Sequence, residues 1–212
     1  MEGEERFEKQ EKFSVMIPTF EPSRSLLDAI QSVLKQFDEA AAHENNLSKD
    51  SLQITVVDDT SSTVDVLSLL KKSGLADRVE FVKSGKHLGL AGNWNYAISL
   101  ARADLVHLLH QDDLVERGFY QRMWQAFQEH PELGMAFCRS KIVDDKSHVI
   151  KKTSRLRWQR GVLDTWLWRI GERQRVQCPS AVVKKATYAA IGGFRPDLIQ
   201  ALDWEMWVRI AG

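Results

Sequence analysis

The sequence has few cysteines, no long apolar segment and no excess of charge of either sign. Its two cysteines, Cys138 and Cys178, are too few for a disulfide framework and lack metal-site spacing. A reducing compartment is therefore expected, and we expect a cytoplasmic protein that can sit at the inner face of the membrane. No run approaches the ~20 apolar residues that cross a bilayer, and the charged N-terminus is not typical of a secretory signal.

The charge balance argues against general electrostatic binding to nucleic acid. Lysine and arginine together number 29, as do aspartate and glutamate, so the formal net charge is zero. We therefore expect no nucleic-acid partner. Hydrophobic residues make up 43% of the 212 positions and charged residues 27%, which is ordinary for a globular protein that buries a sizeable core.

Residues 1–12 carry five glutamates and are expected to form a flexible charged tail, and residues 13–212 to form one domain. Within the domain, short apolar runs alternate with segments of helical spacing. The runs predict strands at 13–17, 52–57, 79–82, 105–109 and 135–138. The spacing predicts helices at about 26–37, 64–70, 93–102 and 119–127. From Lys141 onward the pattern becomes irregular.

This alternation indicates an α/β fold with parallel strands and helices on both faces of the sheet. Ligands of such sheets bind at the carboxyl ends of the strands. Pro18 and Thr19, Asp58 and Asp59, and residues 111–113 should therefore lie along one edge.

Two pairs of adjacent aspartates follow predicted strands, Asp58-Asp59 and Asp112-Asp113. One strand-end aspartate often only caps a helix or starts a turn. Adjacent carboxylates repel each other unless a cation offsets the cost, and Mg²⁺ or Mn²⁺ commonly sits on carboxylates plus substrate phosphates. The two pairs therefore suggest a metal–diphosphate ligand.

Other phosphate and metal signatures are missing. Gly85, Gly89 and Gly92 fit neither the Walker lysine motif nor the dinucleotide fingerprint. His107 and His110 are three residues apart on a predicted strand and should face opposite sides, so we expect packing or surface roles rather than a metal pair.

Six short segments carry a family resemblance when taken together and in order. They are Phe13–Glu21, Val56–Ser61, Leu88–Asn95, Leu109–Asp113, Gly192–Phe194 and Leu202–Trp207. In this order they resemble the inverting family 2 glycosyltransferases of GT-A fold. The resemblance implies an enzyme with a mostly parallel, Rossmann-like central sheet that moves a hexosyl or related sugar from a nucleotide-diphosphate sugar to an acceptor hydroxyl. The acceptor would be a glycan or a lipid-linked molecule, in polysaccharide, O-antigen or other cell-surface glycan synthesis.

The resemblance also implies roles for single residues. The donor nucleotide would be held by Pro18, Thr19, Glu21, Asp58, Asp59, Gly89, Asn93 and Asp112. Asp113, with Asp112, would hold the Mg²⁺ or Mn²⁺ ion. Many members carry an arginine near position 93, and its absence here leaves the base open.

Asp203 matches the family's catalytic base, although the glutamate that usually precedes it is replaced by Leu202. A positioned carboxylate must take the proton of the acceptor hydroxyl as the new bond forms. Glu205 is a less suitable base. The alternative is that Asp203 only caps the helix that carries Trp204 and Trp207.

The segment 151–175 is basic, with eight lysines and arginines against two acids, and three tryptophans lie among them. It could bind an anionic acceptor or contact the membrane peripherally. The alternative, which the sequence favours, is a solvated face with buried tryptophans. The sequence ends nine residues after Asp203, where the resemblance implies further elements, so we expect a domain truncated at its C-terminus.

Two other functions stay open at this point. One is a nucleotidyltransferase-like nucleotide-sugar enzyme, although the glycine- and arginine-rich loop typical of that class is not found at residues 18–22. The other is a non-catalytic nucleotide-binding relative, which the early end of the sequence favours and the intact aspartate pairs oppose.

Overall fold

The computed structural model describes residues 11–41 and 47–212. Its strands are β1 (Phe13–Thr19), β2 (Leu52–Asp58), β3 (Glu80–Lys83), β4 (Leu105–Leu108), β5 (Met135–Phe137), β6 (Lys141–Val143), β7 (Val149–Lys152) and β8 (Ala181–Lys184). Its α-helices are α1 (Ser25–Ala41), α2 (Val66–Lys72), α3 (Gly89–Ser99), α4 (Phe119–Glu129), α5 (Trp166–Glu172), α6 (Lys185–Ile191) and α7 (Leu202–Ala211). Two 3-10 turns, η1 (Lys49–Ser51) and η2 (Cys178–Ser180), precede β2 and β8.

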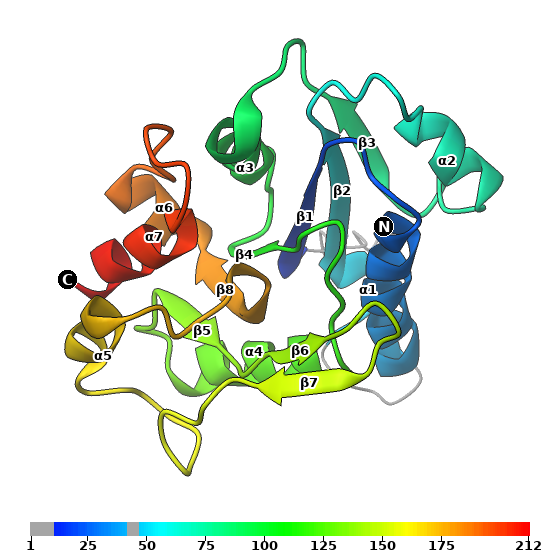
Figure 1. Cartoon of the computed structure of the whole chain (residues 1–212). Helices are drawn as coiled ribbons and strands as arrows, with labels where there is room; N and C mark the ends of the chain where they lie inside the picture. Colours follow the sequence, from blue (N-terminus) through cyan, green and yellow to red (C-terminus); the bar gives the residue numbers. More distant parts are fainter. Residues whose placement is uncertain (1–10, 42–46) are drawn as a thin grey trace, which may run out of the picture.

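Six strands form the central sheet in the order β3-β2-β1-β4-β8-β5, and β6 pairs with β7 in a separate hairpin (Figure 1). The strands β3, β2, β1 and β4 are parallel, and β8 is antiparallel to both of its neighbours. The prediction of an α/β domain with a mostly parallel sheet is confirmed.

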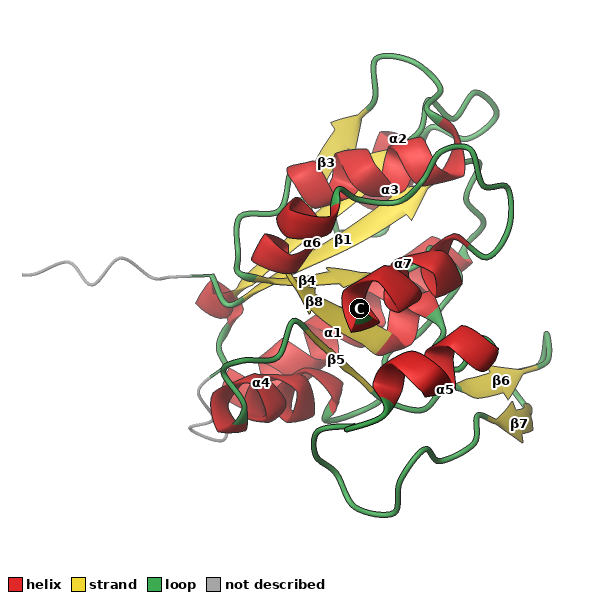
Figure 2. Cartoon of the chain, turned by 90° about the vertical axis from the view of Figure 1, so that its left-hand side faces the viewer, coloured by secondary structure: helices red, strands yellow, loops and turns green. Residues whose placement is uncertain are grey.

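The sheet is covered on both faces, as the alternation predicted (Figure 2). Side chains along β1 point alternately to the two faces because the strand repeat is two residues. Val15 and Ile17 join one core layer with side chains of α1, α2 and α4. Met16 joins the other layer, with Trp94 of α3 and Trp207 of α7. All seven residues of β1 are buried, as expected of a central parallel strand.

The second half of the sheet differs from the prediction. A strand was expected at 135–138, and β5 is there, but β8 lies between it and β4. The sequence pattern predicted neither β8 nor the hairpin. β8 has only four residues, and the hairpin strands are exposed at every position, so neither carries a clear apolar period.

The predicted tail falls largely outside the described residues. Glu11 and Lys12 are described, and both contact the domain. The Lys12 amide donates to the Ser51 carbonyl at 2.8 Å, and Glu11 pairs with Arg102 at 2.7 Å. Ordered contacts therefore begin just before β1.

The strand register brings the predicted site segments to one edge of the sheet. Thr19, the last residue of β1, pairs with Asp58, the last residue of β2, and Met16 pairs with Leu108, the last residue of β4. The loops after these three strands therefore leave the sheet at the same edge, as parallel topology requires.

Candidate active site

Asp58 shapes the turn that leaves β2. Its carboxylate is buried and accepts a hydrogen bond from the Ser61 amide at 3.1 Å and another from the Ser61 hydroxyl. Lys83 on the neighbouring strand β3 lies 3.7 Å from the other oxygen. This is the turn-forming role that a strand-end aspartate commonly takes.

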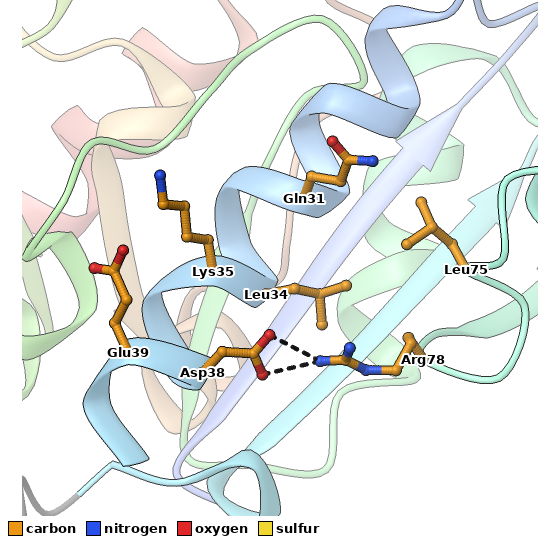
Figure 3. A pocket seen from close by; sticks show the side chains of 7 residues that line it. All are labelled: Gln31, Leu34, Lys35, Asp38, Glu39, Leu75 and Arg78. Carbon is orange, nitrogen blue, oxygen red and sulfur yellow. Dashed lines mark hydrogen bonds and ion pairs between the residues drawn. The ribbon is translucent and has the colours of Figure 1, made fainter. Parts of the chain in front are cut away.

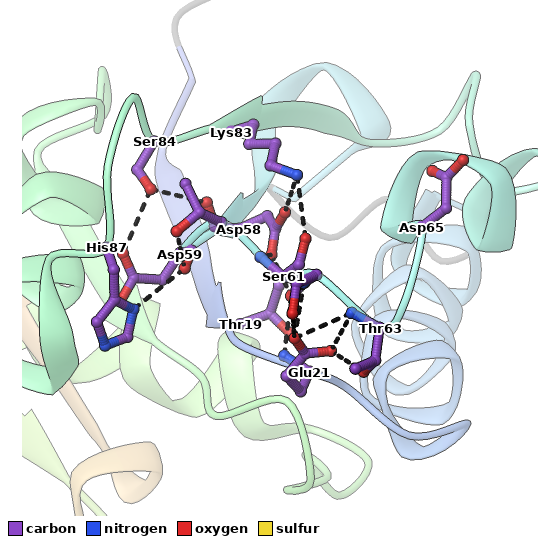
Figure 4. Close-up of polar contacts among 12 residues, drawn as sticks. Thr19, Glu21, Asp58, Asp59, Ser61, Thr63, Asp65, Lys83, Ser84 and His87 are labelled. Atoms are coloured by element: carbon purple, nitrogen blue, oxygen red, sulfur yellow. Dashed lines mark hydrogen bonds and ion pairs between the residues drawn. The ribbon is translucent and has the colours of Figure 1, made fainter.

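Asp59 joins the end of β2 to the start of α3 (Figure 4). Its buried carboxylate accepts hydrogen bonds from the Leu88 amide at 2.7 Å and the Gly89 amide at 2.9 Å, and His87 Nδ1 lies 2.9 Å from it. Gly89 has a φ of 71°, which favours glycine at this turn. Amides at a helix N-terminus bind carboxylates well because they carry partial positive charge.

Two more predicted donor residues join this cluster. The Asp59 amide donates to the Thr19 carbonyl at 2.8 Å. The Asn93 side-chain amide donates to the carbonyls of Val57 at 3.2 Å and Thr19 at 3.4 Å. Asn93 Oδ1 is buried and has no hydrogen-bond partner among the described residues. The structure therefore brings Thr19, Asp59, Gly89 and Asn93 together.

Glu21 fastens two loops to each other. Its carboxylate accepts hydrogen bonds from the amides of Ser62 at 2.6 Å and Thr63 at 3.1 Å and from both hydroxyls. These bonds, from the Thr63 hydroxyl first, lower the pKa of Glu21 to about 2. The sequence predicts that Glu21 lies beside the nucleotide. In the structure its carboxylate oxygens accept hydrogen bonds from the loop after β2 (Figure 4).

Gln111 connects the loop after β4 to the loop after β1, which sequence reasoning did not foresee. Its side-chain oxygen accepts from the Thr19 hydroxyl and from the Phe20 amide at 3.0 Å, and its amide donates to the Phe20 carbonyl at 3.3 Å. The only signal in the sequence is its place directly before Asp112 and Asp113.

The second aspartate pair forms a candidate metal site together with His110. Ligand atoms of His110, Asp112 and Asp113 lie within 4.8 Å of one another. His110 Nδ1 is 3.4 Å from Asp113 Oδ2. Asp112 is exposed, Asp113 is half-buried, and the buried His110 Nε2 has no partner among the described residues. Two carboxylates and an imidazole fit a divalent cation such as Mg²⁺ or Mn²⁺.

Asp58 and Asp59 do not belong to this group. The two aspartate pairs therefore do not form one metal site among the described residues. The first pair instead makes hydrogen bonds with Ser61, Leu88 and Gly89 and an ion pair with Lys83.

The two histidines behave differently from each other. His107 is fully buried in β4, with hydrogen bonds joining Nδ1 to the Tyr120 hydroxyl at 2.9 Å and Nε2 to the Pro179 carbonyl at 3.0 Å. Burial lowers its pKa to about 4, so it stays neutral near pH 7. The packing role expected for His107 is confirmed. His110 is half-buried and stacks on Trp94, and it also belongs to the candidate metal group, which its position two residues before Asp112 could have signalled.

Asp203 is the second residue of α7. The residue before the helix is Ala201, which makes no side-chain cap, so Asp203 is not the cap of its helix. Its carboxylate accepts hydrogen bonds from the Trp204 amide at 2.8 Å and from Gln174 Nε2 at 2.7 Å. Burial raises the pKa of Asp203, and the amides of Trp204 and Cys178 and the charge of His110 oppose part of that rise.

Asp203 lies near the candidate metal site. Burial raises the pKa of the Cys178 thiol, and the charges of Asp203 and Asp113 raise it further. His110 stacks on Trp94, and Trp94 belongs to the same core layer as Leu202 and Trp207 of α7, so the loop after β4 and the start of α7 adjoin one part of the core. A carboxylate of raised pKa beside a candidate cation site is an arrangement that can accept a proton near the metal.

An open groove of about 590 Å³ lies elsewhere, between α1 and the segment after α2 (Figure 3). Its lining includes Lys35, Asp38 and Arg78, and none of the predicted site residues. Arg78 stands just before β3 begins, so the groove is at the amino end of the sheet, opposite to the candidate site. We assign no function to it.

The sequence profile described as Glycosyl transferase family 2 matches residues 14–195. The chain belongs to glycosyl transferase family 2. The family resemblance is thereby confirmed, and of the six short segments only Leu202–Trp207 lies wholly outside the matched residues. The family 2 chain is 26% identical over 219 residues to the uncharacterized protein MT1568 of Mycobacterium tuberculosis (strain CDC 1551 / Oshkosh), an alignment that covers 93% of this chain and 61% of that protein.

Solved structures of GT-A glycosyltransferases share the fold of this family 2 domain. S. aureus TarS 1-349 in complex with UDP-GlcNAc superposes with a TM-score of 0.67 at 19% identity, covering 94% of this chain and 53% of that one. The mannosyltransferase PcManGT from Pyrobaculum calidifontis, in complex with GDP-Man and Mn²⁺, gives 0.66 at 17% identity, covering 95% and 52%. The family 2 chain thus spans about half the length of these two structures.

Proposed function

We propose that this glycosyltransferase transfers a sugar from a nucleotide-diphosphate sugar to an acceptor hydroxyl with inversion at the anomeric carbon. The observation that supports this best is that the group of His110, Asp112 and Asp113 and the start of α7, which carries Asp203, adjoin the same core layer around Trp94. A proton acceptor and a cation site are the two elements that such a transfer needs at one place.

The donor nucleotide is proposed to lie along the carboxyl ends of β1, β2 and β4. The exposed Asp112 and the loop that holds Thr19 and Gln111 would contact it directly. Asp58, Asp59 and Glu21 would act by holding the surrounding loops, because their carboxylates accept hydrogen bonds from those loops. The titles of two similar structures, which name UDP-GlcNAc and GDP-Man, support a nucleotide-sugar donor and leave its base open.

In the proposed reaction, the acceptor oxygen attacks the anomeric carbon from the side opposite the diphosphate. The new carbon–oxygen bond forms as the bond to the diphosphate oxygen breaks, and the bonding electrons leave with the nucleoside diphosphate. The acceptor proton passes to the Asp203 carboxylate. A divalent cation held by Asp113 and Asp112 would supply positive charge against the departing diphosphate.

A panel of donors tests this function. The chain is incubated with Mn²⁺ or Mg²⁺ and with UDP-, GDP- or dTDP-linked sugars, and the released nucleotide is separated by chromatography. We expect release of a nucleoside diphosphate from one class of donor. Pyrophosphate release would instead favour the nucleotidyltransferase alternative. Tight nucleotide binding without any release from any donor would favour a non-catalytic relative. Heat-unfolded chain is the control.

The acceptor is proposed to be lipid-linked or to be reached at a membrane surface. Trp158 and Trp168 are 88% and 83% exposed, so the expectation that the tryptophans of this segment are buried was wrong for both. Trp166 is half-buried and lies against Phe137. The loop between β7 and α5, with its exposed Arg155, Arg157 and Arg160, runs along the outside of the domain (Figures 1 and 2). Within the described residues no helix is both long enough and apolar enough to span a bilayer. The exposed tryptophans and arginines lead us to propose a peripheral contact with an anionic surface on the cytoplasmic side.

Replacing Trp158 and Trp168 together with alanine should weaken binding to vesicles of phosphatidylglycerol and phosphatidylcholine. Loss of two indole rings from the interface is expected to lower binding by roughly tenfold or more. Co-sedimentation measures this, with pure phosphatidylcholine vesicles as the neutral surface. Ile199→Ala removes an equally exposed apolar side chain at 90% exposure and serves as the control. Equal binding of wild type to neutral and anionic vesicles would contradict the proposal.

A further inference from the structure

The His110 ring stands at the carboxyl end of β4 with its plane set by a neighbour. It stacks on the Trp94 indole of α3, with ring centroids 4.9 Å apart and planes 27° apart. Trp94 is itself buried and contacts Phe194 edge-on at 5.0 Å. The stack holds the imidazole by ring contact and leaves its nitrogens for polar partners.

The nitrogens of His110 are not engaged in the way that a structural histidine requires. Nε2 is buried and has no hydrogen-bond partner within the described residues, which costs free energy unless a ligand compensates. Nδ1 is 3.4 Å from Asp113 Oδ2. By contrast, His107 three residues earlier has both nitrogens hydrogen-bonded.

The distances between the ligand atoms of His110, Asp112 and Asp113 suit the binding of one cation. Two ligands at right angles on an ion with bonds of about 2.1 Å stand about 3 Å apart. His110 Nδ1 and Asp113 Oδ2, 3.4 Å apart, are close to that separation. One ligand atom from each of His110, Asp112 and Asp113 lies within 4.8 Å of the other two. The group therefore offers one nitrogen and two oxygens to the same point.

We propose that His110 is a ligand of the divalent cation and makes the site prefer Mn²⁺ over Mg²⁺. This inference rests on the proposed function, which places the ion on Asp112 and Asp113. Mg²⁺ favours oxygen ligands and exchanges water reluctantly, whereas an imidazole nitrogen binds first-row transition ions more strongly. One nitrogen among carboxylate oxygens therefore shifts the balance toward Mn²⁺.

The experiment uses the whole chain with Mn²⁺ alone, without donor or acceptor. Pulsed electron paramagnetic resonance of the Mn²⁺-loaded chain should show coupling to a histidine ¹⁴N nucleus. Calorimetry should show that the ratio of the Kd for Mg²⁺ to the Kd for Mn²⁺ falls roughly tenfold in His110→Phe. Phenylalanine keeps a ring to stack on Trp94 but has no nitrogen. In His110→Asp, an oxygen replaces the nitrogen, so Mg²⁺ binding should strengthen relative to Mn²⁺.

His148→Phe is the matched control, because this histidine lies in the exposed hairpin beside Asp144 and belongs to no candidate metal group among the described residues. Its ¹⁴N signal and its Kd ratio should equal those of wild type. Thermal unfolding of each variant shows whether it is folded. Mn²⁺ binding without ¹⁴N coupling, or a Kd ratio that His110→Phe and His110→Asp leave unchanged, overturns the role of His110 alone. If wild type binds neither ion, the metal assignment in the proposed function also fails.

Discussion

Replacing Asp203 with asparagine is expected to remove sugar transfer while leaving nucleotide binding intact. An amide has nearly the shape of the carboxylate but cannot accept the acceptor proton, and general base catalysis commonly contributes about 10²- to 10⁴-fold to the rate. We expect kcat to fall by roughly that factor, with the affinity for the nucleoside diphosphate unchanged. Steady-state kinetics gives the first quantity and calorimetry the second.

The pH dependence follows from the same residue. Burial raises the pKa of Asp203, so the folded chain holds this proton to a higher pH than the unfolded chain does. The stability contributed by the group is therefore lost as pH rises through its two pKa values, and an uncharged asparagine should not lower the Tm at neutral pH. Activity of wild type should rise with pH along a limb that lies above the ordinary aspartate value of about 3.9.

Glu205→Gln is the control for this prediction. Glu205 is the nearby acid on the same helix, and its carboxylate is paired with Arg209 at 2.7 Å. The Glu205→Gln variant should keep the turnover of wild type, even if losing the ion pair with Arg209 lowers its Tm. Turnover in Asp203→Asn close to that of wild type would remove Asp203 from the mechanism.

Changing Asp113 to asparagine is expected to abolish the part of nucleotide binding that depends on Mn²⁺. The amide keeps the side-chain shape but removes the negative charge that a hard cation requires. Loss of a supporting contact around a metal commonly costs 10- to 100-fold in affinity, so loss of a ligand should cost at least about a hundred-fold. Calorimetry with UDP and GDP, each with and without Mn²⁺, measures the effect.

Asp145→Asn makes the same chemical change at an exposed position in the β6–β7 hairpin and should bind as wild type does. If Asp113→Asn kept wild-type affinity in the presence of Mn²⁺, the metal would have to be held elsewhere.

Much of the first half of the domain could be predicted from the sequence because each of its strands and helices has a clear local pattern of apolar residues. The apolar run at 13–17 appears as β1, extended to Thr19, and the run at 52–57 appears as β2, extended to Asp58. Buried parallel strands need near-continuous apolar residues, and the covering helices need one apolar face, so both leave periods that can be read. The predicted helix at 93–102 instead spans Gly89–Ser99, because the Gly89 turn starts it early.

The second half left weaker signals. The four residues of β8 form a strand because they pair with β4 on one side and β5 on the other. A strand that short has no clear local period of apolar residues. Trp158 and Trp168 look like core residues by type, yet both stay largely exposed within the described part of the chain. Burial of a side chain is decided by which elements come together, and a sequence pattern reports only the preference of the residue.

The candidate site shows the same division. The sequence by itself determined that Asp112 and Asp113 were candidate metal ligands and Asp203 the candidate base, because residue type and order along the chain carry that information. The tertiary structure alone decided that Asp59 and Glu21 fasten loops, that Gln111 links two of them, and that His110 joins the acids. These roles depend on distances between side chains far apart in the sequence, and such distances exist only once the sheet edge and α7 have come together.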